Sequence, residues 1–160
     1  MASLVKDLVE AGIHFGHRAT NWNPKMRPYI FGKRNKIHVI DVRETVKGLL
    51  LARKFITRTV GEGKDVLFVG TKRQAQDIIM EEARRAEMYF VANRWLGGTL
   101  TNFRTIKQGL DRLRTLERMR DEGTYEQLPK KEVVRLERER ERLEKFIGGL
   151  KGMGNLPAVM

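Results

Sequence analysis

The middle of the chain alternates short apolar runs with longer segments in which apolar residues recur every three or four positions. Residues 37–42, 65–70 and 88–92 are runs of strand length, whereas 44–60 and 73–86 have the spacing of amphipathic helices. The order strand, helix, strand, helix, strand predicts an α/β fold with a parallel sheet flanked by helices.

A charged segment follows at residues 104–147, with 13 basic and 10 acidic side chains among 44. Its apolar positions fall at spacings of three and four, which is typical of a coiled-coil seam. One half of the seam consists of Val133, Leu136, Arg140, Leu143, Ile147 and Leu150, and the other of Ile106, Leu110 and Leu113. Gly123 and Pro129 bracket a polar turn, so we expect an antiparallel helical hairpin.

These patterns divide the chain into an α/β part at 1–103, a hairpin insertion at 104–147 and a return segment at 148–160. The last residues have the composition of an approach to a further strand, so the sheet is expected to be incomplete. Residues 13–36 show no sustained period and contain several turn formers, which predicts irregular structure.

The excess of basic over acidic residues indicates which class of partner the chain binds. The 160 residues contain 32 Lys and Arg against 20 Asp and Glu, giving a net charge of +12 and a pI of about 10.3. Such a surface attracts polyanions, of which nucleic acid is the first to consider. A membrane is a weaker candidate, because no apolar run approaches the roughly 18 residues of a spanning helix. Without a secretory segment or any cysteine, the chain is expected to be cytoplasmic.

The strongest local charge signal lies at residues 17–36, which contain six cations and no carboxylate. Trp22, Tyr29 and Phe31 are interleaved with these cations, as in surfaces that neutralise phosphates and offer planes to bases or sugars. The candidate RNA-binding residues here are Arg18, Trp22, Lys25, Arg27, Lys33, Arg34 and Lys36. The alternative is a solvated basic loop whose aromatic residues pack against one another and bind no partner.

Two further segments carry cations near the expected strand ends. Lys72 and Arg73 follow a buried strand and precede a helix, a position suited to an RNA phosphate, to a mononucleotide or to ordinary helix-start chemistry. Neither a Walker pattern nor a three-glycine dinucleotide fingerprint is present. Arg94 precedes the Gly97-Gly98 pair and is a further candidate for RNA contact, whereas Trp95 and Leu96 are expected to plug the sheet at the hairpin root.

Metal and catalytic sites find little support. His14 and His17 have the spacing of a metal pair that His38 would complete, but cysteines and a clear carboxylate partner are missing, so we expect neither metal nor cofactor. No nucleophile elbow or dense carboxylate cluster appears in the α/β part. The chain is therefore not expected to be an enzyme.

Several motifs in order along the chain resemble those of small-subunit ribosomal protein two, in its bacterial or organellar form. They are Ala11-Gly12-Ile13-His14-Phe15-Gly16-His17, Trp22-Asn23-Pro24-Lys25-Met26, Tyr29-Ile30-Phe31-Gly32, Phe68-Val69-Gly70-Thr71-Lys72 and Arg94-Trp95-Leu96-Gly97-Gly98-Thr99-Leu100-Thr101-Asn102. The resemblance covers the whole chain, and members of that family continue past the position of Leu156-Pro157.

The resemblance implies a flavodoxin-like (Rossmann-like) α/β domain with an inserted coiled-coil hairpin. It further implies a structural role in the small ribosomal subunit, with ribosomal RNA bound on the solvent side between head and body. Neighbouring ribosomal proteins, including the large mRNA-binding one, would be its protein partners, in a cytoplasmic or an organellar ribosome. No membrane and no small-molecule substrate are implied.

Two rival hypotheses remain open. The α/β pattern also suits an enzyme that binds a nucleotide or sugar phosphate at the strand ends, an argument that rests on fold analogy alone. The charged segment 104–147 also suits a protein-docking arm. Calorimetry with nucleotides bears on the first hypothesis, and deletion of the hairpin bears on the second.

Overall fold

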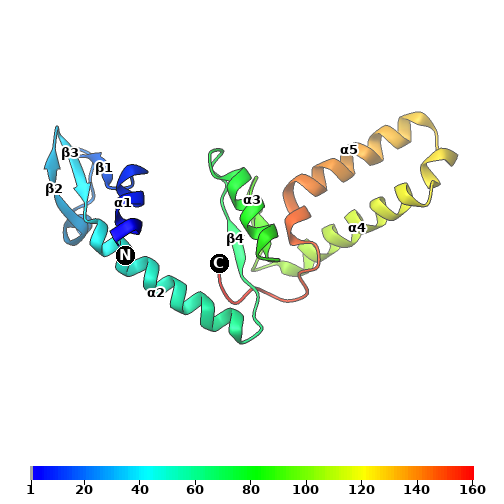
Figure 1. Cartoon of the computed structure of the whole chain (residues 1–160). Coiled ribbons are helices and arrows are strands. Elements are labelled where there is room, and N and C mark those ends of the chain that lie inside the picture. Colours follow the sequence, from blue (N-terminus) through cyan, green and yellow to red (C-terminus); the bar gives the residue numbers. More distant parts are fainter. Residues whose placement is uncertain (1) are drawn as a thin grey trace. The chain divides into compact units, whose positions relative to one another are not determined.

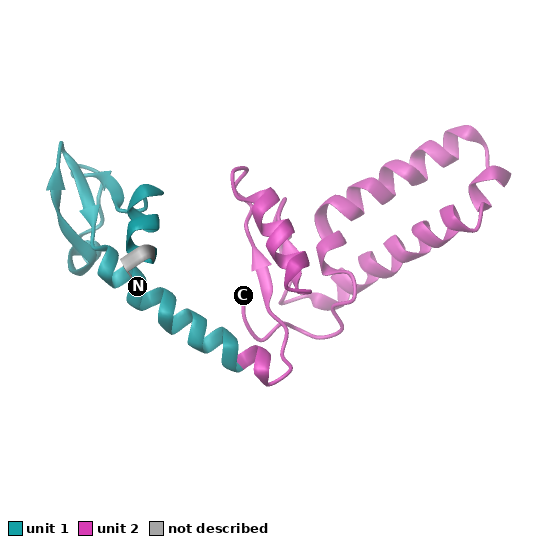
Figure 2. Ribbon diagram, in the orientation of Figure 1, with its two compact units in different colours: residues 1–58 teal, residues 59–160 magenta. Residues whose placement is uncertain are grey.

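The computed structural model describes residues 2–160, which form a mixed α/β structure of two compact units (Figures 1 and 2). The first unit is residues 1–58 and the second is residues 59–160. Each unit contains its own small sheet. The expected mixture of helices and strands is therefore confirmed, whereas the arrangement of the strands differs from the prediction.

The first unit is built on a three-stranded antiparallel sheet in the order β1-β3-β2. Its elements are α1 (Ala2–Glu10), β1 (Phe15–Arg18), the 3-10 helix η1 (Pro24–Tyr29), β2 (Ile30–Arg34), β3 (Ile37–Ile40) and α2 (Val42–Gly61), the last of which ends in the second unit. Among residues 4–58 no side chain is fully buried. The hydrogen-bonded sheet, and not an apolar core, is thus the main ordering element of this unit.

Two sequence predictions about this region are wrong. The run 37–42 was expected in a parallel sheet, but β3 is the central strand of an antiparallel one. Residues 13–36 were expected to be irregular, but they contain β1, η1 and β2. The turn between β2 and β3 explains the second error, because Asn35 and Lys36 adopt φ values of 47° and 63°. A two-residue hairpin turn of type I′ requires positive φ values at both central residues, and the usual sequence signal for it is a glycine, which is missing here.

Helix α2 begins at an acidic cap. The carboxylate of Asp41 accepts the backbone N–H of Arg43 at 2.9 Å and two hydrogen bonds from the Arg43 guanidinium, at 3.1 and 2.9 Å. Hydrogen bonding to Arg43 holds the pKa of Asp41 below its usual value. The helix stops before Gly63, whose φ of 72° is left-handed, as expected of a glycine that follows a helix. The predicted helix at 44–60 is therefore confirmed.

The second unit begins with a parallel strand pair joined by a helix. Strand β4 (Leu67–Val69) pairs with β5 (Tyr89–Val91), and α3 (Gln76–Arg85) connects them. On its other side, β4 is extended by a parallel bridge between Val66 and Val159, where the Leu67 N–H donates to the Val159 carbonyl at 2.9 Å. This βαβ unit is the portion of the predicted parallel sheet that residues 2–160 contain.

The hairpin consists of α4 (Phe103–Asp121), the 3-10 turn η2 (Thr124–Gln127) and α5 (Lys130–Ile147), after which η3 (Gly148–Leu150) returns to the sheet (Figure 1). Its root and the parallel strands share one apolar core. That core consists of Leu67, Val91, Ile106, Leu110, Ile147, Leu150 and Met153, with Trp95 and Leu96 packed against it. The expectation that Trp95 and Leu96 plug the sheet at the hairpin root is thereby confirmed.

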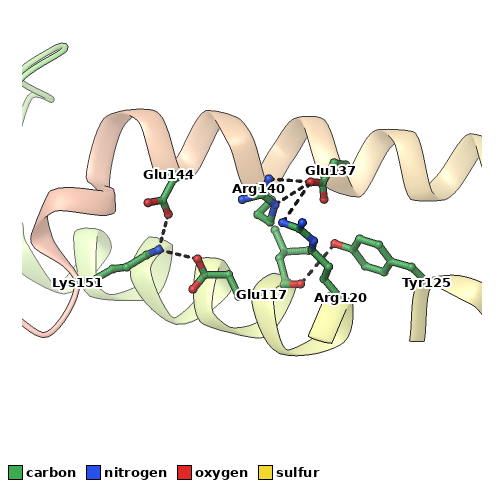
Figure 3. Close-up of polar contacts among 8 residues, drawn as sticks. Glu117, Arg120, Tyr125, Glu137, Arg140, Glu144 and Lys151 are labelled. Carbon is green, nitrogen blue, oxygen red and sulfur yellow. Dashed lines mark hydrogen bonds and ion pairs between the residues drawn. The ribbon is translucent and has the colours of Figure 1, made fainter. Parts of the chain in front are cut away.

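Polar contacts join the two helices outside this core (Figure 3). The Lys151 ammonium contacts the carboxylates of Glu117 on α4 and Glu144 on α5, so one cation ties both helices to the return segment. Arg140, which interrupts the apolar seam, forms an ion pair with Glu137 at 2.7 Å. The seam thus accommodates a largely buried arginine through a local ion pair.

The first prediction concerns Leu113, which is 0% exposed between α4 and α5. Leu113→Ala should lower the free energy of unfolding by about 2–5 kcal/mol, because it removes buried methyl groups and leaves a cavity. Chemical denaturation followed by circular dichroism measures this change. The control is Val134→Ala on α5, whose side chain is 50% exposed. Equal losses in the two variants would contradict the assignment of the seam.

The second prediction concerns acid. Hydrogen bonds from Arg112 and Arg140 hold the pKa values of Glu139 and Glu137, respectively, below the usual value of 4.5. A lowered folded pKa stabilises the protein above the unfolded value, and this stabilisation is lost as the pH falls through the folded value. Melting temperatures should therefore fall on acidification below about pH 4.5, and less steeply in the Glu137→Gln/Glu139→Gln variant. Glu141→Gln, at an exposed position, should follow the unmodified chain.

Candidate nucleic-acid interface

The antiparallel sheet places predicted cations on both of its faces. Arg18 on β1 and Arg34 on β2 are both Cα partners of Ile37, so the three side chains share a face. On that face a hollow of about 270 Å³ is lined by Phe15, Arg34, Asn35, Ile37 and Val39. An arginine is therefore presented beside an exposed aromatic ring, since Phe15 is 64% exposed.

The opposite face combines cations with two rings in contact. Lys33 pairs with His38 in the sheet, and the Trp22 ring lies 4.8 Å from the His38 ring between centroids, tilted by 37°. A hollow of about 280 Å³ here is lined by Trp22, Arg27, Ile30, Gly32, Lys33 and His38. Both ring nitrogens of His38 are enclosed and make no hydrogen bond within residues 2–160. No local pattern in the sequence indicated that His38 would contact Trp22.

A larger hollow lies at the end of the sheet beside the β2–β3 turn. It has a volume of about 640 Å³ and is lined by Arg18, Ala19, Thr20, Lys33, Asn35, Lys36 and Ile37. The Ala19 N–H donates to the Lys36 carbonyl at 2.9 Å, and this bond holds together the two backbone segments that line the hollow. Lys33 lines both this hollow and the one beside Trp22. The uncharged donors Thr20 and Asn35 were missed from the sequence, because only the folded turn brings them beside the cations.

Lys25 is held differently from the other cations. It lies in η1, where its backbone N–H donates to the Asn23 side chain at 2.9 Å, and its own side chain is exposed.

The seven predicted residues of the first unit form what we call the sheet patch: Arg18, Trp22, Lys25, Arg27, Lys33, Arg34 and Lys36. All six cations are exposed, and none forms an ion pair within the described part of the chain. The sheet patch is thus an uncompensated positive surface.

The three remaining predicted residues belong to the second unit. Lys72 and Arg73 are exposed in the turn before α3, where the Gln76 side chain donates to the Thr71 carbonyl at 3.2 Å. Arg94 is exposed after β5, next to Asn93, whose side chain donates to the Lys145 carbonyl at 2.8 Å. That bond ties the loop to α5. These cations lie at the carboxyl ends of β4 and β5, as the strand pattern predicted.

The described residues were also searched for a metal site and for a membrane-spanning helix. His17 is exposed, and the His14 ring lies 4.1 Å from the Phe15 ring between centroids. Within residues 2–160 no group of three His, Cys, Asp or Glu side chains has an arrangement that holds a metal ion. Over the same residues, no helix has the length and hydropathy needed to cross a membrane.

Comparison with known proteins identifies the family of the chain. The family model of ribosomal protein S2 matches residues 8–160. One relative is the small ribosomal subunit protein uS2 of Sorangium cellulosum (strain So ce56), which is 70% identical over 156 residues. Those residues are 98% of this chain, which spans 56% of the length of that curated relative. Because the family model matches nearly the whole chain, the chain belongs to the ribosomal protein S2 family.

Proposed function

We propose that the protein is a structural, non-enzymatic constituent of the small ribosomal subunit that binds small-subunit ribosomal RNA. The observation that carries this proposal is the sheet patch, whose six exposed cations have no acidic partner in the described residues. Uncompensated cations gain affinity for RNA by releasing its counterions. Membership of the ribosomal protein S2 family supports RNA as the polyanion.

The hollows of the sheet patch suggest how RNA is held. Lys33 lies between the polar hollow at the β2–β3 turn and the hollow lined by Trp22. A phosphate beside Arg18, Lys33 and Lys36 would leave the neighbouring nucleotide next to the Trp22 ring. Recognition of unpaired RNA commonly combines cations with aromatic planes in this way. We therefore assign the sheet patch to an unpaired segment of the ribosomal RNA.

The wider assignments follow from the family. We infer that the partners are ribosomal RNA and other small-subunit proteins, including the large mRNA-binding one, within a cytoplasmic or organellar ribosome. Lys72, Arg73 and Arg94 would add phosphate contacts at the ends of β4 and β5. No observation favours the rival nucleotide-binding enzyme, since Lys72 and Arg73 are simply exposed before α3.

We also propose a finer description of the fold. The parallel β4–β5 pair, the connecting α3 and the bridge to Val159 are compatible with one part of a flavodoxin-like sheet. The three- and four-residue spacing of the buried seam is compatible with a coiled coil. In this description residues 1–103 contribute to the RNA-binding α/β domain, 104–147 are the inserted hairpin and 148–160 return to the sheet.

The third prediction tests the sheet patch through ionic strength. The plot of log affinity for single-stranded RNA against log salt should be steep, and Arg27→Gln/Lys33→Gln should reduce its slope by about 0.7 for each lost phosphate contact. Fluorescence anisotropy with labelled RNA measures both slopes. The control is Lys6→Gln/Lys47→Gln, which removes equal charge from lysines already paired with Glu10 and Glu44. An unaltered slope in the patch variant would exclude these two residues from the interface.

The fourth prediction separates stability from binding at one position. Lys36 has a φ of 63°, a conformation that is costly for residues with a Cβ atom. Lys36→Gly should therefore raise the free energy of unfolding by up to about 1 kcal/mol, while weakening RNA binding through the lost charge.

Denaturation and anisotropy on the same preparation give the two readouts. Lys36→Asn is the matched control, because asparagine tolerates this backbone conformation and also removes the charge. Both variants should bind RNA more weakly. Binding equal to that of the unmodified chain in both would show that Lys36 serves the turn alone.

A further inference from the structure

The outer face of α5 carries a continuous line of cations. Lys131, Arg135, Arg138, Arg142 and Lys145 follow one another at spacings of four, three, four and three residues, and all five are exposed. With 3.6 residues per turn, this spacing keeps them within one narrow sector of the helix. The opposite sector holds the buried seam of the hairpin. We call these five residues the α5 stripe.

The acidic residues of α5 are largely engaged elsewhere. Glu137 contacts Arg140 and Arg120, and Glu144 contacts Lys151 (Figure 3). Glu139 forms a two-pronged pair with Arg112 at 2.9 and 3.0 Å. These partners lie on α4, in the seam and in the return segment. The hairpin has nearly balanced charge by composition, but three of the five acids of α5 are paired with cations outside the stripe, whose own cations lie on the exposed side of the helix.

The cations of the stripe have little internal compensation. Arg135 approaches Glu132 at 3.5 Å, with the Arg135 side chain 76% exposed, and such exposed pairs contribute little. The other four residues of the stripe form no ion pair within residues 2–160. Glu132, Glu139 and Glu141 lie at its margins, and Glu139 also interacts electrostatically with Arg142 and Arg135. The stripe is thus a second positive surface, in a different unit from the sheet patch.

The surface of the stripe is not flat at the start of α5. Lys130, Lys131, Val134, Arg135 and Arg138 line an open hollow of about 500 Å³. Cations that line a hollow surround an anion from more than one side. The repeat of cations along the rest of the helix, and not this hollow alone, favours a ligand with repeated negative charges along an edge over a single small anion.

The stripe differs from the sheet patch in having no aromatic residue. The only aromatic residue of α5 is Phe146, which packs against the core. Proteins that bind unpaired RNA stack its bases on aromatic rings, whereas double-stranded RNA is recognised through its shape, phosphates and 2′-hydroxyls. The stripe runs for about 21 Å with a cation roughly every 5 Å. These features match the regular phosphate backbone of a duplex.

We propose that the α5 stripe binds the phosphate backbone of an RNA double helix, separately from the sheet patch. This inference rests on the proposed function only in taking RNA as the class of partner. It assigns duplex RNA to the second unit and leaves unpaired RNA to the first.

The test compares four forms of the full chain: unmodified, the stripe variant Arg135→Gln/Arg138→Gln/Arg142→Gln, the patch variant Arg27→Gln/Lys33→Gln, and their combination. Affinity is measured across salt concentrations for an RNA duplex of about 16 base pairs and for an unstructured single strand. The matched control is Arg104→Gln/Arg114→Gln/Arg118→Gln, which removes equal charge from exposed positions on α4, where Asp111 pairs with Arg114. Circular dichroism checks that every form is folded.

The stripe variant should lower the salt slope for the duplex by up to about 3, with a smaller change for the single strand and for the α4 control. An unaltered duplex slope in the stripe variant overturns the proposal and leaves the sheet patch untouched. Equal losses for duplex and single strand overturn the assignment to duplex RNA. Failure of the patch variant alone to lose single-strand affinity counts against the proposed function and not against the stripe.

Polyglutamate serves as a probe for an acidic protein partner. If it competes with the duplex for the stripe as effectively as unlabelled duplex does, at equal charge concentration, RNA is not the selected ligand and the proposal fails. Weak competition by polyglutamate supports it.

Discussion

The second unit depends on one apolar core that contains both the parallel strands and the root of the hairpin. Ile147 and Leu150 pack with Leu67 and Val91, so α5 and the sheet cannot form their buried contacts independently. Gly149 permits this closeness, because a Cβ atom there would lie 2.3 Å from the Phe90 carbonyl oxygen. A two-stranded sheet has little stability alone. Its order, and the position of the cations at its strand ends, therefore follow from packing against the hairpin.

Elements with a strong local period could be predicted from the sequence, and those defined by distant pairing could not. Helices α2, α4 and α5 repeat apolar residues over many turns, and β4 is an apolar run beside a helix. The run at Ile37 has the same local appearance, but its partners are β1 and β2 and not β4. Its misplacement arose because a four-residue strand carries no information about its neighbours. The Asn35-Lys36 turn, which fixes the β2–β3 register, lacks the glycine that would have revealed it.

The candidate site was predictable in composition but not in geometry. An acid-free stretch at residues 17–36 correctly indicated exposed, unpaired cations. That Arg34 faces Phe15 while Lys33 faces Trp22 and His38 depends on sheet register, which a one-residue shift would reverse. On the hairpin, the small net charge of the segment gave no indication that one face of α5 is basic. The 13 basic and 10 acidic residues of 104–147 nearly cancel in number, yet five cations of α5 line up on one exposed face with acids only at its margins.

The seam of the hairpin sets a rule for its length. Because α4 and α5 turn by about 100° per residue, removing seven residues from each helix shortens the arm by about 10 Å and rotates the remainder by only about 20°. Removing five would rotate it by about 140°, bringing charged side chains into the seam and turning the stripe toward α4. Variation in the length of this arm is thus constrained to near-multiples of the heptad, and its reach changes in steps of two helical turns while the direction of its charged face is kept.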